Sequence, residues 1–124
     1  ESDDDMAEIL SEYEDVQKVL HCFSSDSKFA QKIMSDSQFF SFTGVVTYTQ
    51  ADSIREAINE IPLSKIMIET DCPYLTPKTY GKAPNEPAYV TEIAKVISQV
   101  KNCSYEEVCK QTTANASHFF NLTI

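Results

Sequence analysis

Apolar residues recur along the chain with two different spacings, and their order predicts alternating strands and helices. Short β-rich apolar segments at residues 16–23, 39–46 and 66–71 have the character of buried strands. Helical spacing is found over residues 3–15, around Phe29–Met34, and over residues 49–61, 86–100 and 104–120. Because parallel strands need a crossover connection that is normally a helix, this order predicts an α/β fold with a parallel sheet.

The polar and turn residues between these segments set the expected boundaries. Asp26 supplies N-cap chemistry for the second helix, Pro62 ends the third, and Ser104 with Glu107 forms a capping box for the last. Four of the five prolines lie in residues 73–87, which predicts a long ordered loop of the kind that usually serves function.

Composition limits the size and the partners of the predicted fold. A length of 124 residues fits one domain, but three parallel strands are fewer than the five or six of the usual doubly wound domains. The formal net charge of −9 disfavours direct attraction to nucleic acid, so an anionic substrate would need metal ions or another subunit. No apolar run is long enough to cross a membrane, and the cysteine spacing suggests reduced thiols, so a cytoplasmic location is expected.

Two of the strand ends carry side chains with metal-binding chemistry. His21 ends the first predicted strand, where alternation puts it on one face with Val19 and Phe23. Glu69 and Asp71 share a face at the end of the third strand. Paired carboxylates are costly to bury without a cation or donor, so they favour a metal or acid–base role, with a structural ion pair as the alternative.

His21 and Asp71 together would supply a nitrogen and an oxygen ligand to one divalent cation. Two protein ligands are fewer than the three of a catalytic zinc site, so the sequence predicts part of a metal site. A thiolate site made by Cys22 and Cys72 is the alternative, but alternation turns both thiols away from the cavity.

A series of motifs in a fixed order resembles the C-terminal half of a TatD-type hydrolase. The motifs are VLHCFS (Val19–Ser24), SFTG (Ser41–Gly44), ETDCPYLTP (Glu69–Pro77), NEP (Asn85–Pro87) and TTAN (Thr112–Asn115). The resemblance covers essentially all of residues 16–122. It implies that residues 1–124 form a partial TatD-like domain, the C-terminal half of a TIM (β/α)8 barrel.

The resemblance also implies a function and a set of site residues. The resemblance implies hydrolysis of phosphodiester bonds, typically of DNA by a 3′–5′ exonuclease. It also implies two divalent metal ions in a complete site, and the sequence does not distinguish Mg, Mn and Zn. His21 and Asp71 match metal ligands, and Asp71 also matches the residue that handles the proton of water. The matched supporting or substrate-loop residues are Ser24, Glu69, Asn85 and Glu86.

Departures from the family pattern define the alternatives. The opening H-x-H motif, the bridging glutamate and a further histidine ligand have no counterpart, and His118 is expected to pack or face solvent. The enzyme hypothesis therefore requires the N-terminal half of the barrel or a second copy as partner, with DNA or another phosphodiester as substrate and no membrane. The alternatives are a non-catalytic half-barrel that associates through its open sheet edges, and a small phosphate-binding domain using Asp71 and magnesium.

Overall fold

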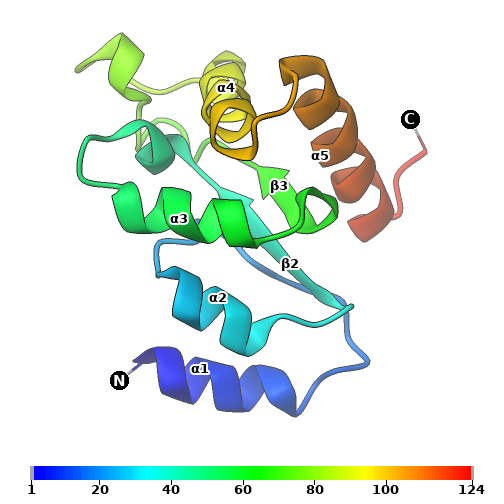
Figure 1. Ribbon diagram of the computed structural model, residues 1–124. Helices are drawn as coiled ribbons and strands as arrows, with labels where there is room; N and C mark the ends of the chain where they lie inside the picture. The colour runs from blue at the N-terminus through cyan, green and yellow to red at the C-terminus, as the bar shows by residue number, and fades with distance from the viewer. Residues whose placement is uncertain (1, 124) are drawn as a thin grey trace.

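The computed structural model describes residues 2–123 as a parallel three-stranded sheet with helices packed around it (Figure 1). The strands are β1 (Lys18–Leu20), β2 (Gln38–Phe42) and β3 (Ile66–Ile68), in the order β1-β2-β3. The helices are α1 (Ser2–Ser11), α2 (Ser27–Ile33), α3 (Asp52–Glu60), α4 (Val90–Lys101) and α5 (Tyr105–Phe119). The α/β class and the parallel sheet predicted from the apolar spacing are confirmed.

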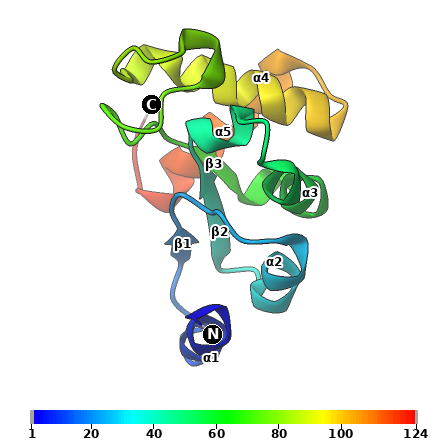
Figure 2. The ribbon, with the colours of Figure 1, turned by 90° about the vertical axis from the view of Figure 1, so that its left-hand side faces the viewer.

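The core lies between the sheet and the helices α2 and α3, which are seen on the same side of the strands in Figure 2. Phe40, Phe42 and Ile66 present one face of the sheet and are fully buried. Ala30 of α2 and Ile58 of α3 close over this face without any exposed surface. The opposite face is covered in part by α5, where Phe119 meets Phe39 edge-on with ring centroids 5.5 Å apart.

All three strands are shorter than the apolar runs that predict them. The backbone leaves the extended conformation soon after each strand, with φ of 49° at Cys22 and 55° at Asp71. After β2, the side chain of Thr43 accepts a hydrogen bond from the Val45 amide and begins a 3-10 turn at Gly44–Thr47. An apolar run therefore contains the strand together with the buried turn that follows it.

The helices begin and end close to where the polar residues predict. Asp26 caps α2 by accepting a hydrogen bond from the Phe29 amide, and α3 ends at Glu60, two residues before Pro62. Ser104 accepts a hydrogen bond of 3.1 Å from the Glu107 amide at the start of α5. None of the helices among residues 2–123 is long and apolar enough to cross a membrane.

Helix α1 differs from its expected form. The helix ends at Ser11 rather than Asp15, and Ala7 is its buried residue. The apolar side chains of Met6, Ile9 and Tyr13 are exposed to 40%, 55% and 55%. Helix α1 packs mainly against α2, and its apolar side chains Met6 and Ile9 keep much of their surface exposed.

Candidate metal centre

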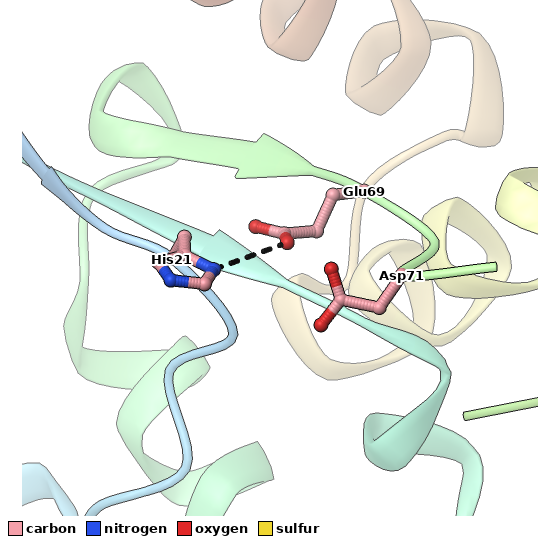
Figure 3. Close-up of side chains that lie close together, drawn as sticks. All are labelled: His21, Glu69 and Asp71. Carbon is pink, nitrogen blue, oxygen red and sulfur yellow. Dashed lines mark ion pairs between the residues drawn. The ribbon is translucent and has the colours of Figure 1, made fainter. Parts of the chain in front are cut away.

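His21, Glu69 and Asp71 meet where β1 and β3 end (Figure 3). One ligand atom from each of these residues lies within 4.8 Å of the other two. Among residues 2–123, this is the single cluster of three or more such side chains with that geometry. The predicted meeting of His21 with Asp71 is present, although β2 lies between the strands that carry them.

His21 reaches the cluster because the chain turns sharply after β1. The left-handed conformation of Cys22 interrupts the strand, so the expected alternation of faces stops there. Phe23 then enters the core, with its ring 5.3 Å from that of Phe40 and 6.1 Å from that of Phe29. The prediction that His21 and Phe23 share a face is therefore wrong, because the His21 side chain is 77% exposed whereas Phe23 is buried.

Glu69 connects the ends of β1 and β3. Its backbone amide donates to the Phe42 carbonyl at 3.0 Å, and its Oε2 accepts a hydrogen bond from the Cys22 amide at 3.2 Å. Its Oε1 lies 3.7 Å from Nδ1 of His21, which is ion-pair distance if the imidazole is protonated and too long for a hydrogen bond. Glu69 thus holds the turn that presents His21, and it also places an oxygen among the three ligand atoms.

Asp71 is exposed and sits on a tightly turned backbone. Its φ of 55° is in the left-handed region, which aspartate adopts more readily than most residues. The Tyr74 amide donates to the Asp71 carbonyl at 3.0 Å, so the turn closes directly after the carboxylate. The carboxylate therefore returns toward the strand end instead of following the loop away from it.

Asn85 holds this loop in place from below. Its buried side-chain amide donates to the carbonyls of Thr70 at 2.8 Å and Tyr74 at 2.7 Å. Its backbone amide donates to the Pro73 carbonyl at 3.0 Å, and its Oδ1 accepts from the Glu86 amide at the same distance. Asn85 is thus not one of the three ligand residues. It fixes the backbone before and after Asp71 through the carbonyls of Thr70 and Tyr74.

Gly44 permits the loop after Asp71 to approach the turn after β2. A side chain at this position would overlap the carbonyl oxygen of Leu75. The absence of a side chain at Gly44 is therefore required by the close approach of these two segments.

Cys22 lies nearer to the cluster than alternation predicts. Its Sγ is 3.7 Å from Oγ1 of Thr43. Burial raises the pKa of the Cys22 thiol, the contact with Thr43 opposes this, and the carboxylates of Asp71 and Glu69 raise the pKa further. The expectation that this thiol faces away from the cavity is wrong for Cys22, because the left-handed turn brings it toward the carboxylates.

The remaining predicted residues lie outside the cluster of ligand atoms. Ser24 is exposed and lines a cavity of about 180 Å³ together with His21. Glu86 is also exposed, beside Asn85. His118 is exposed on α5, where its Nε2 lies 3.0 Å from Nε2 of Gln17, so its expected position away from the site is confirmed.

The donor set of the cluster fits a divalent cation. One imidazole nitrogen with two carboxylate oxygens suits zinc, manganese or another first-row metal. The exposure of His21 and Asp71 leaves their outer side accessible to further ligands. Three ligands from two strand ends are enough to hold an ion and leave other coordination positions open.

Comparison with known proteins shows which proteins this chain is similar to. Residues 1–121 match the family described as TatD related DNase. The chain is 37% identical over 121 residues to the uncharacterized metal-dependent hydrolase YabD of Bacillus subtilis, covering 96% of this chain and 48% of YabD. It is 36% identical over 104 residues to the uncharacterized metal-dependent hydrolase YcfH of Escherichia coli K12, covering 84% of this chain and 39% of YcfH.

Solved structures share the same fold. YjjV, a TatD homolog from Escherichia coli K12, aligns with 98% of this chain and 48% of its own at a TM-score of 0.87 and 23% identity. A TatD family hydrolase from Entamoeba histolytica aligns with 94% of this chain and 46% of its own at a TM-score of 0.80 and 22% identity. The chain therefore spans less than half the length of each of these relatives.

Proposed function

Because this chain belongs to the family of TatD-related DNases, we propose that it is the C-terminal half of a TIM-barrel hydrolase that cleaves phosphodiester bonds with divalent metal ions. We propose DNA as the substrate and 3′–5′ exonucleolytic cleavage as the reaction. The observation that carries the proposal is the convergence of His21, Glu69 and Asp71 within 4.8 Å at the carboxyl ends of two parallel strands. Ligand sites of barrel enzymes are built at this end of the strands.

We propose a different role at one cation for each of the three side chains. A divalent ion held by His21 and Asp71 would polarise a phosphate oxygen and lower the pKa of an attacking water. We propose that Asp71, whose side chain is exposed in the cluster, accepts the proton that water loses. Glu69 orients His21 through its hydrogen bond to the Cys22 amide and through its position beside Nδ1 of the imidazole.

The proposed reaction requires a partner for this half. A complete family site uses two metal ions, and this chain offers one cluster of three ligands among residues 2–123. Both outer strands, β1 and β3, pair with β2 alone in the described sheet. We propose that an N-terminal half or a second copy pairs with these edges and supplies the remaining ligands.

One observation favours a second candidate function, that of a non-catalytic half-barrel which associates through its surface. Large apolar side chains are exposed on and just after α1, namely Met6, Ile9, Tyr13 and Val16. An apolar surface of this kind is commonly a contact surface. This candidate predicts association without metal-dependent hydrolysis.

Hydrolysis assays with matched variants separate the two candidates. Single-stranded DNA and a chromogenic phosphodiester would be incubated with the chain and Mg²⁺, Mn²⁺ or Zn²⁺, alone and with a separately expressed N-terminal half of a relative. We expect metal-dependent turnover that His21→Ala and Asp71→Ala each reduce by at least about a hundredfold, since each change removes a metal ligand.

His118→Ala is the matched control, because it removes the chain's other histidine, which lies outside the cluster. It should leave turnover at the parental level. Turnover that survives His21→Ala and Asp71→Ala would rule out the proposed site, and association without turnover in any combination would favour the half-barrel.

A further inference from the structure

A second hollow lies beside the loop that follows Asp71 and has no part in holding the metal. It has a volume of about 450 Å³ and is formed where the segment after the Gly44–Thr47 turn faces the proline-rich loop. Tyr48 and Thr49 line one side, and Thr76, Lys78 and Lys82 line the other. A larger cavity of about 910 Å³ shares Tyr48, Thr49 and Lys78 with it, and we call these two adjoining cavities together the depression.

The charge of this depression contrasts with that of the chain. The whole sequence carries −9, with ten basic residues. Two of the ten, Lys78 and Lys82, line the smaller cavity, and none of the described residues around it is acidic. The larger cavity adds Arg55 and Lys95, which face Asp52 and Glu92 in ion pairs. The smaller cavity is therefore the part with uncompensated positive charge.

The walls of the smaller cavity are fixed by hydrogen bonds that cross it. The Lys78 amide donates to Oγ1 of Thr47 at 2.8 Å, and Nζ of Lys78 donates to Oγ1 of Thr49 at 2.7 Å. The Tyr48 hydroxyl donates to the Thr76 carbonyl at 3.1 Å. The Arg55 guanidinium holds the segment that carries Tyr48, because it donates to the carbonyls of Val46 at 2.8 Å and Tyr48 at 2.7 Å.

Lys82 differs from the other basic residues of the depression. It is exposed and forms no hydrogen bond or ion pair with the described residues. Its ammonium is thus available to a ligand in a cavity that Lys78 and Thr49 also line. Ammonium groups together with hydroxyl donors on a fixed frame are the chemistry that recognises a phosphate group.

We propose that this cavity is a phosphate subsite, which holds a backbone phosphate of the substrate other than the one that is cleaved. This proposal rests on the proposed function and specifies how a chain of charge −9 binds a polyanion. The cavity is lined by Thr76 and Lys78 of the loop that follows Asp71, and Asn85 holds the start of the same loop through the carbonyls of Thr70 and Tyr74. Contacts to phosphates of this kind position a nucleic acid without reading its bases.

The test measures binding without metal, so that it does not depend on catalysis. A fluorescein-labelled short oligothymidylate would be titrated with the chain in EDTA at several salt concentrations, with fluorescence anisotropy as the readout. We expect Lys82→Glu to weaken binding about fivefold or more and to reduce the slope of log K against log salt by about one, as for loss of one phosphate contact. Lys78→Gln should weaken binding independently.

Lys110→Glu on α5 is the control, since it makes the same change in net charge at an exposed lysine that does not line the cavity. It should bind within about twofold of the parent. Inorganic phosphate should displace the oligonucleotide from the parent, whereas thymidine should not. Equal effects of Lys82→Glu and Lys110→Glu, no binding by the parent at low salt, or displacement by thymidine alone would overturn the subsite.

The failure of the subsite and that of the proposed function give different results. If His21→Ala hydrolyses DNA normally, the proposed function fails. If Lys82→Glu binds the oligonucleotide as the parent does, the subsite fails.

Discussion

At the scale of single residues, the positions of His21 and Asp71 depend on hydrogen bonds that neighbouring side chains make with the backbone. Asn85 ties the loop carbonyls of Thr70 and Tyr74 to its own amide, and these carbonyls lie on either side of Asp71. The Glu69 carboxylate accepts a hydrogen bond from the Cys22 amide and so fixes the turn after β1. These hydrogen bonds fix the backbone next to His21 and Asp71. Bonds of this kind keep metal ligands in position before an ion binds.

Asn85→Ala tests this dependence. The change leaves two carbonyls of the loop without their donor, so we expect the free energy of unfolding to fall by about 2 kcal/mol. Metal affinity should fall as well, because Asp71 loses its support. Urea unfolding and metal titration are the two measurements. Glu86→Ala, at the exposed neighbour, should change neither by more than about 0.5 kcal/mol; an Asn85→Ala protein of parental stability and affinity would show that the clamp is dispensable.

At the scale of elements, α5 is joined to the start of β3, whereas the site is at the end of that strand. The buried Asn115 side chain donates to the carbonyls of Leu63 at 2.9 Å and Ile66 at 2.7 Å. Its Oδ1 accepts a hydrogen bond of 2.7 Å from Gln111 within the same helix. This polar contact fixes how α5 lies against the sheet.

Asn115→Ala should therefore affect stability without affecting the metal. Loss of the two hydrogen bonds that the Asn115 side chain donates is expected to lower the free energy of unfolding by about 2–3 kcal/mol. The affinity of the folded protein for metal should stay at the parental value, which distinguishes this variant from Asn85→Ala. Thr113→Ala, at an exposed position of α5, is the control. Parental stability of Asn115→Ala would contradict the role assigned to this contact.

The same elements show which features a sequence reveals. Apolar spacing predicted the order of strands and helices because burial imposes it locally, and Asp26 and Ser104 marked helix starts by capping chemistry. Alternation failed after Leu20, because the left-handed turn at Cys22 is a backbone feature that apolar spacing does not encode. Asn85 and Asn115 could not be assigned from spacing either, since their acceptors are backbone carbonyls, in the case of Asn115 more than 45 residues earlier.

At the scale of the whole molecule, the described residues expose large apolar side chains and leave two strand edges without a partner strand. The apolar side chains of Met6, Ile9 and Tyr13 face outward, and both β1 and β3 are edge strands in the described sheet. The metal cluster, by contrast, is assembled entirely from residues of this chain. We therefore propose two separate steps: this chain binds a cation by itself, and the complete reaction requires a partner at the open edges of the sheet.

Direct titration of the chain with a divalent metal tests the central claim. Isothermal titration calorimetry with Mn²⁺ and Zn²⁺ would be carried out on the parent, His21→Ala, Asp71→Ala and the control His118→Ala. We expect one ion per chain, with affinity reduced at least about tenfold by His21→Ala and by Asp71→Ala, and unchanged by His118→Ala. Equal affinity of the parent and His21→Ala, or no binding by the parent, would contradict it.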